Sequence, residues 1–242
     1  MDRKEYLKYQ YNYHKYISKQ YNRLANYHMS ISNIYNNKLL KKVNTNEFNI
    51  VTKKFLKPNI EVRYPQITNL ENKLVEQQLN KKLKDRAFSL MEDQERDQYN
   101  LVYMDASYNI KLNEKNLLSI YFNNYGYSKG AAHGGMLTNS ITLDIKNAKE
   151  YEIKDLFKPN SKYKKRLSDI IKKQIKEKDI YLLGEFESIN NNQDYYLTND
   201  KLVIYFQVYE YTPYAYGIPK FDIDYNLISD IIDMKGPIGR LI

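Results

Sequence analysis

The stretch LLSIYFNNY, residues Leu117–Tyr125, decides the fold class. From Leu118 to Asn123 its apolar side chains alternate with Ser, Tyr and Asn, a two-residue period that is typical of a β-strand with two different faces. A second alternating run, Tyr99–Leu112, precedes it, and the polar residues Asn113–Asn116 between the runs suit a hairpin loop. The sequence therefore predicts an antiparallel strand pair at the centre of the fold.

The segments on either side of this hairpin predict further strands and helices. Pro65 and Asn69 are expected to introduce the first helix, and the charged stretch Glu92–Gln98 to end it. We expect strands within 48–62, 137–145, 195–198, 201–211 and 221–223, and helices within 70–90, 161–178 and 225–234. The predicted fold class is α+β: a mainly antiparallel sheet with helices on one face, preceded by a long N-terminal amphipathic helix.

The strand predicted over Lys201–Tyr211 has an aliphatic side and a tyrosine side, like the first stretch. We expect the aliphatic sides to pack under the helices. The tyrosine and amide sides could stack on sugar rings or bases, or simply form a solvated sheet face. Glu210 has the parity of the aliphatic side, so either the strand ends before it or its carboxylate is buried with a partner, for which His133 is a candidate.

The composition argues against catalysis. The 242-residue chain has no Cys, which excludes disulfides, Cys-ligated zinc, iron–sulfur clusters and thiol chemistry. It has three His, namely His14, His28 and His133, and no HExxH, GxSxG, GxGxxG or phosphate-loop motif. Acid pairs such as Glu150 and Glu152 are typical of solvated strand edges. We therefore expect no catalytic residues, no metal and no cofactor.

The lack of long apolar segments and the bias in amino-acid composition indicate where the protein is located and what kind of organism it comes from. The chain has no apolar run of the roughly 18–20 residues that a transmembrane helix requires, and no apolar segment follows Met1 as a signal peptide would. Asn, Lys, Ile and Tyr are abundant and share A/T-rich codons. This bias predicts a low-GC bacterial genome, so Lys and Asn richness is weak evidence of function.

The net charge of +9 is concentrated near the N-terminus. Residues 1–57 hold 12 Lys/Arg and 3 Asp/Glu, whereas residues 58–242 hold 26 of each. From Tyr6 to Tyr35 apolar side chains recur every three or four residues, which predicts one amphipathic helix over about residues 3–36. Its stripe is rich in Tyr, so we expect it to dock on its own domain, on a partner or, as the favoured alternative, on a second copy to form a homodimer.

This basic arm also suggests a second function from a different class. Concentrated positive charge favours an acidic partner, such as teichoic acid or, less expected, nucleic acid, although a solvated Lys-rich helix face has the same sequence pattern. The residues that would bind a polyanion are Lys4, Lys8, Lys15, Lys19 and Arg23.

Several segments resemble a known family. They are IEVRYPQI at Ile60–Ile67, GAAHG at Gly130–Gly134, LTNDKL at Leu197–Leu202 and YEYTPYAYGIP at Tyr209–Pro219. Their order resembles the tandem DUF4163/DUF3298 domain pair of some peptidoglycan deacetylases and of the lysozyme-sensing anti-sigma factors of low-GC bacteria. The resemblance divides the chain into the arm, residues 1–43, a DUF4163-like part, 44–160, and a DUF3298-like part, 161–242, with 44–242 expected to form one compact unit.

The resemblance implies a non-catalytic binding module of the bacterial envelope or spore surface. Its ligand would be a wall glycan or a wall-directed protein such as lysozyme. The chain shows neither the sigma-binding segment and membrane span of the anti-sigma factors nor the metal-dependent catalytic domain of the deacetylases, so neither activity is expected of it. Tyr side chains and a rigid Pro turn suit an interface, and the expected contact residues are His133, Tyr209, Glu210, Pro213, Tyr214 and Tyr216.

Overall fold

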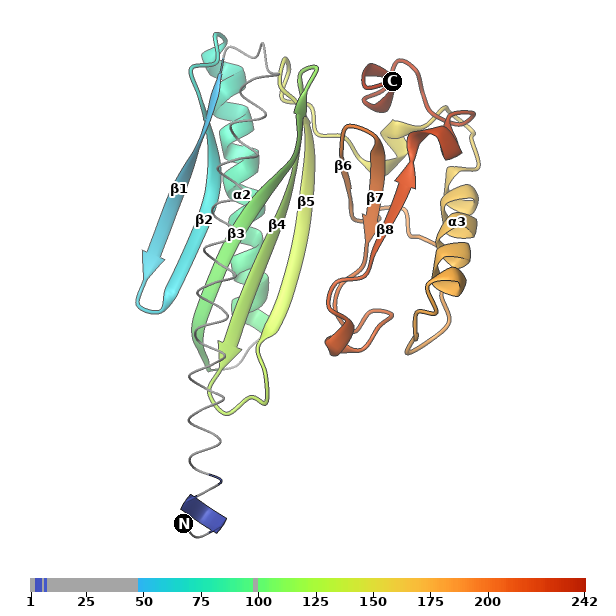
Figure 1. The fold of residues 1–242 in the computed structure, drawn as a ribbon. Helices are drawn as coiled ribbons and strands as arrows, with labels where there is room; N and C mark the ends of the chain where they lie inside the picture. The colour runs from blue at the N-terminus through green and yellow to red at the C-terminus, as the bar shows by residue number, and fades with distance from the viewer. Residues whose placement is uncertain (1–2, 6, 8–47, 98–99) are drawn as a thin grey trace. The chain divides into compact units, whose positions relative to one another are not determined.

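The computed structural model describes residues 3–5, 7, 48–97 and 100–242 (Figure 1). The chain divides into two compact units, Met1–Thr45 and Asn46–Ile242. In the first unit the described residues 3–5 and 7 are helical and exposed. The remainder of the predicted arm helix lies outside the described residues, together with Lys8, Lys15, Lys19 and Arg23, so its docking and its polyanion binding stay predictions.

The second unit begins with a five-stranded sheet in the order β1-β2-β3-β4-β5. Neighbouring strands are antiparallel except β2 and β3, which run parallel and are joined by helix α2. The predicted central hairpin is confirmed as β3–β4, and its turn residues Lys115 and Asn116 have φ angles of 50° and 62°, as a tight hairpin turn requires. The bounds are β1 Asn49–Lys57, β2 Ile60–Thr68, α2 Lys73–Asp97, β3 Leu101–Glu114, β4 Leu117–Ser128 and β5 Gly135–Asp144.

Helix α2 covers one face of this sheet (Figure 1). Its apolar residues recur at steps of three or four and are buried against the aliphatic side of β4, as predicted. At its N-terminus the Asn72 side chain accepts hydrogen bonds from the amides of Leu74 and Val75. Asn80 bonds both the N–H and the C=O of Ile67 at 2.7 and 2.8 Å, which fixes the helix to the end of β2.

Both predicted boundaries of this helix were wrong. Pro65 lies inside β2, paired with Thr52 of β1, because the hairpin register continues to Thr68 and buries Ile67 completely. The charged stretch after Met91 does not end the helix, which continues to Asp97. Met91 and Gln94 are 6% and 1% exposed, so packing on the sheet outweighs the polar composition of this turn.

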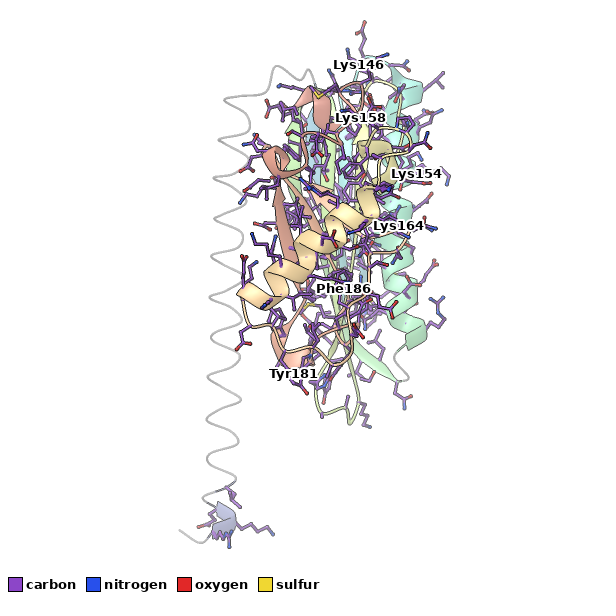
Figure 2. The ribbon with its side chains drawn as sticks, turned by 90° about the vertical axis from the view of Figure 1, so that its right-hand side faces the viewer. Lys146, Lys154, Lys158, Lys164, Tyr181 and Phe186 are labelled. Atoms are coloured by element: carbon purple, nitrogen blue, oxygen red, sulfur yellow. The ribbon has the colours of Figure 1, made fainter. Side chains whose placement is uncertain are left out.

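A second, three-stranded sheet follows, in the antiparallel order β6-β7-β8. The predicted helix near residues 161–178 is confirmed as α3, and Figure 2 shows it crossing the outer face of this sheet. Leu167 and Ile171 of α3 are completely buried against Leu202 and Ile204 of β7. The bounds are β6 Tyr195–Leu197, β7 Lys201–Tyr205, β8 Lys220–Asp224, α3 Tyr163–Glu177, and the 3-10 turns η1 Ile153–Leu156, η2 Tyr214–Tyr216, η3 Tyr225–Ile228 and η4 Ile238–Arg240.

Two predictions in this half were also wrong. The last helix, expected over 225–234, is only the turn η3, because Ile232 forms a β-bridge with Phe157 and the amide of Asp233 bonds the carbonyl of Leu156. The strand expected over Lys201–Tyr211 ends at Tyr205. Beyond it, the next residues turn, and the chain reverses between Gln207 and Thr212.

The tyrosine side of the strands is not an open surface at Tyr121 and Tyr205, contrary to both alternatives above, each of which requires an exposed face. Tyr121 of β4, Tyr196 of β6 and Tyr205 of β7 form one buried cluster between the two sheets. The Tyr205 hydroxyl donates to Ser140 Oγ of β5 at 2.8 Å, and Ser140 donates to the Tyr195 carbonyl at 2.5 Å. The two sheets therefore share a core that is partly polar and hydrogen-bonded at Tyr205 and Ser140.

The C-terminal turn returns to the first sheet. Arg240 Nη2 lies 2.7 Å from Asp144 Oδ2 and 2.8 Å from the Tyr151 hydroxyl, which itself donates to Asp144 at 3.1 Å. Asp144 is 2% exposed. This buried ion pair joins η4 to the end of β5. No helix among the described parts of the chain is long and apolar enough to cross a membrane.

Candidate functional site

Two loops far apart in the sequence meet at one end of the second unit. The imidazole of His133, in the β4–β5 loop, stacks on the ring of Tyr214 in η2, with ring centroids 3.9 Å apart and planes inclined by 19°. The Tyr209 hydroxyl lies 3.1 Å from His133 Nε2, and His133 Nδ1 lies 2.9 Å from the Gly134 carbonyl oxygen. Because a carbonyl only accepts, Nδ1 carries the proton and Nε2 accepts from Tyr209.

The β4–β5 loop is held by the tyrosines of β4. A Cβ at Gly134 would overlap the ring of Tyr125 and lie 2.5 Å from the Gly126 carbonyl oxygen, so only glycine fits there. The Tyr127 hydroxyl donates to the Ala131 carbonyl at 3.0 Å. These contacts present His133 toward the second loop.

In the second loop, the side-chain amide of Gln207 forms the kind of hydrogen bonds that the backbone of a neighbouring strand would form. Gln207 Nε2 donates to the Thr138 carbonyl at 2.8 Å, and Gln207 Oε1 accepts from the Thr138 amide at 3.1 Å, so the amide pairs with β5 where β7 has ended. Tyr211 packs edge-on against Phe186 and Phe206, with centroids 5.3 and 5.0 Å away. The loop is therefore anchored on both sides of Tyr209, whose φ is 64°.

The first of the two alternatives for Glu210 is confirmed. Glu210 is exposed, because β7 ends before it, and its Oε2 accepts from the Gln207 amide at 2.9 Å. The hypothesis that Glu210 pairs with His133 is wrong, since the Tyr209 hydroxyl is the partner of the imidazole. The carboxylate closes the turn that carries Tyr209.

We call His133, Tyr209, Tyr214 and Tyr216 the aromatic patch. Tyr209 and Tyr216 are 54% and 49% exposed, whereas Tyr214 is half-buried beneath His133 and 5.7 Å from the Tyr209 ring. Burial and the neighbouring tyrosines raise the pKa of the Tyr214 hydroxyl, so it stays neutral. The patch can stack, bury apolar area and exchange hydrogen bonds through its hydroxyls.

The structure thus brings His133 together with Tyr209 and Tyr214, and places Pro213 at the start of η2 and Tyr216 at its end. Sequence reasoning did not assign a positioning role to Tyr125 or Gln207. The described parts of the chain hold no group of three His, Cys, Asp or Glu residues arranged to bind a metal ion.

Two family models match separate segments of the chain, and each segment holds part of the aromatic patch. Residues 154–226 match the model of a protein of unknown function (DUF3298), and residues 51–136 match that of deacetylase PdaC. The chain carries this tandem domain pair. His133 lies in the PdaC-type part and Tyr209, Tyr214 and Tyr216 lie in the DUF3298 part, so the aromatic patch forms where the two domains meet.

The chain is also similar to the anti-sigma-V factor RsiV of Bacillus subtilis (strain 168), with 31% identity over 192 residues. The match covers 72% of this chain and 65% of RsiV, so the chain spans slightly less than two thirds of that relative's length. Two crystal structures of DUF3298 proteins share the fold. The one from Bacteroides fragilis has a TM-score of 0.58 at 20% identity and the one from Pseudomonas aeruginosa 0.58 at 15%, each covering 81% of this chain and 96% and 95% of its own.

Proposed function

We propose that this chain is a non-catalytic recognition module of the bacterial envelope or spore surface, and that its aromatic patch binds a wall-directed protein such as lysozyme. The similarity to RsiV and to DUF3298 proteins supports a sensing or binding role outside the cytoplasm. The observation that carries the proposal is the His133–Tyr214 stack with its Tyr209 hydrogen bond.

The geometry of the patch favours a protein partner. Exposed tyrosines supply large contact area with few rotatable bonds, and the tight turn after Pro213 and the stack on His133 order them before binding. Little conformational entropy is then lost on association. Tyr209 and Tyr216 are the anchors expected to enter pockets of the partner.

A wall glycan is the second candidate ligand. Sugar rings stack on open aromatic faces, but His133 and Tyr209 both pack against Tyr214 and occupy its ring. Tyr209, Tyr216 and the imidazole of His133 are exposed, but the Tyr214 ring is not free for a sugar. The patch therefore suits a glycan less well than a protein surface.

The contacts of the two polar residues support a non-catalytic role. Glu210 is bound to the Gln207 amide, and the proton of His133 is directed at a backbone carbonyl. Neither arrangement points an acid and a base at a common substrate atom, as general acid–base catalysis requires.

The functions proposed for the arm remain predictions. The two family models match from residue 51 onward and give the polyanion alternative no support. The homodimer is tested by light scattering of the full chain and of a chain that starts near residue 44, because only the former should dimerise.

Affinity retention tests the main proposal. The full chain is passed over immobilised lysozyme and, separately, over purified Gram-positive cell wall. Retention on lysozyme is the expected result. Retention on cell wall alone would mean that the aromatic patch binds a glycan and not a protein. Failure to bind either matrix would reject the proposal.

A further inference from the structure

Two lysines meet over the tyrosine cluster that joins the sheets. Lys111 Nζ, from β3, lies 5.6 Å from the ring centroid of Tyr121 and 5.2 Å from that of Tyr196. Lys220 Nζ, from the start of β8, lies 4.4 Å from the same Tyr121 centroid. Both ammonium groups therefore interact with a single ring that is only 5% exposed.

Neither of these two lysines forms a salt bridge within the described residues, although the carboxylate of Asp222 acts on Lys220 from a greater distance. Neither ammonium lies within 4.0 Å of a carboxylate oxygen in the described ranges, and Asp222, the neighbour of Lys220 two residues along β8, pairs with Lys201 at 3.6 Å. Burial lowers the pKa of Lys111. Burial followed by the charge of Lys111 lowers the pKa of Lys220, against the opposing charge of Asp222. Two like charges thus share a partly desolvated place where the tyrosine rings give only a weak cation–π attraction.

The lysine pair lies along the same surface as the aromatic patch. The segment from Tyr214 to Lys220 leads directly from the patch to the pair, and along β4 the side chains of Tyr125 and Tyr121 point to the same face of the sheet. Between them Asn109 and Asn123 place their amides side by side, 3.4 Å apart. The half-buried side chains of Asn109 and Asn123 thus lie between the aromatic patch and the lysine pair, beside Asp105, whose carboxylate pairs with Arg63.

We propose that Lys111 and Lys220 form an anion-binding subsite that takes successive anionic groups of a linear wall polymer. Ammonium groups bind phosphate and carboxylate oxygens through charge-assisted hydrogen bonds, and a polyanion relieves the repulsion between the two lysines. The choice of a wall polymer rests on the proposed envelope location, but the subsite does not depend on what the aromatic patch binds. Phosphodiester and carboxylate polymers share this chemistry.

The test compares three oligomers of equal length at fixed ionic strength: a glycerol-phosphate oligomer, a glucuronate oligomer and a neutral N-acetylglucosamine oligomer. Calorimetric titration is made with the full chain and with Lys111→Met and Lys220→Met, which keep the apolar stem over the tyrosines and remove the charge. Lys172→Met, on the exposed face of α3, is the charge-matched control, and Lys111→Arg restores the cation. The better of the two anionic oligomers identifies the natural source.

We expect at least one anionic oligomer to bind. Each Lys→Met variant should weaken its binding about tenfold, which is the size of one lost charge-assisted hydrogen bond. Lys172→Met and Lys111→Arg should bind it as the unchanged protein does. Binding of neither anionic oligomer overturns the proposal. So does binding that persists in both Lys→Met variants, since the polymer then lies elsewhere, the basic arm included. Lysozyme binding measured on the same variants should be unchanged, which separates this subsite from the aromatic patch.

Discussion

His133 stacks on Tyr214 across 81 residues of sequence, with 3.9 Å between the ring centroids. This contact joins the loop of the PdaC-type part to the turn of the DUF3298 part. It can be measured by a double-mutant cycle on unfolding with His133→Ala, Tyr214→Ala and the double variant. We expect a coupling energy of about 1 kcal/mol, the usual size for an aromatic pair. A coupling near zero would mean that the two loops pack independently.

Gly134 supports this stack, because its Cα lies against the ring of Tyr125. Gly134→Ala should force the loop or the ring to move and lower the free energy of unfolding by about 1–3 kcal/mol, as overpacking does. Gly184→Ala is the matched control, since a Cβ there meets no atom within 4 Å. Urea unfolding of both variants makes the comparison, and equal effects would show that Gly134 is not sterically required.

Arg240 should contribute to stability through Asp144. Burial raises the pKa of Asp144. The hydrogen bonds from Arg240 and from the Lys146 amide, together with the charge of Arg240, lower it by more, so the pKa lies below its usual 3.8. Arg240→Met leaves the carboxylate buried without its cation and should lower the free energy of unfolding at pH 7 by about 2–3 kcal/mol. The exposed pair of Arg96 and Asp93 is the control, because Arg96→Met should change stability by less than about 1 kcal/mol.

The pH dependence of the Asp144 contribution follows from the lowered pKa. The stabilisation is complete above the unfolded pKa of 3.8 and is lost as the pH falls through the lower pKa of the folded state. In Arg240→Met the folded-state pKa of Asp144 should rise, because burial remains and the cation is gone, so the loss of stability on acidification should be smaller. Acid unfolding curves that coincide for the two proteins would contradict this assignment.

Asp194 should act in the opposite direction. Burial raises its pKa from 3.8 to about 6, although Gln207 Nε2 donates to its Oδ2 at 3.2 Å. The folded state then binds a proton that the unfolded state has released, so stability falls as the pH rises from about 4 to 6. Asp194→Asn should raise the free energy of unfolding at pH 7 by about 1–2 kcal/mol and remove this slope. An unchanged or lower stability at pH 7 would disprove the raised pKa.

The central hairpin and α3 could be predicted from the sequence because their periodicity is local. The end of β7 could not, since Phe206, Gln207 and Val208 continue the alternation of the strand. What ends it is a contact with a distant strand, where the Gln207 side chain takes over the pairing with Thr138. The burial of Tyr121 and Tyr205 was equally hidden, because alternation shows that a face exists and not that a second sheet covers it.

In the candidate site, too, some residues could be predicted from the sequence and their contacts could not. His133 and the segment from Tyr209 to Tyr216 were named from the sequence, because short, unusual motifs carried a family resemblance. Their partners were not, since the fit of Gly134 against Tyr125 and the Tyr209–His133 hydrogen bond depend on how the loops are brought together. For the same reason the sequence left two alternatives open for Glu210, and the pairing of Glu210 with His133 was wrong.

The most direct test of the account is calorimetric titration of the full chain with lysozyme, compared with Tyr216→Ala and with Tyr181→Ala. Both tyrosines are exposed, by 49% and 72%, but Tyr181, labelled in Figure 2, follows α3 and is not part of the aromatic patch. We expect binding that Tyr216→Ala weakens at least about tenfold, as loss of an anchor residue does, and that Tyr181→Ala leaves unchanged. Absence of binding, or equal affinity of all three proteins, would contradict it.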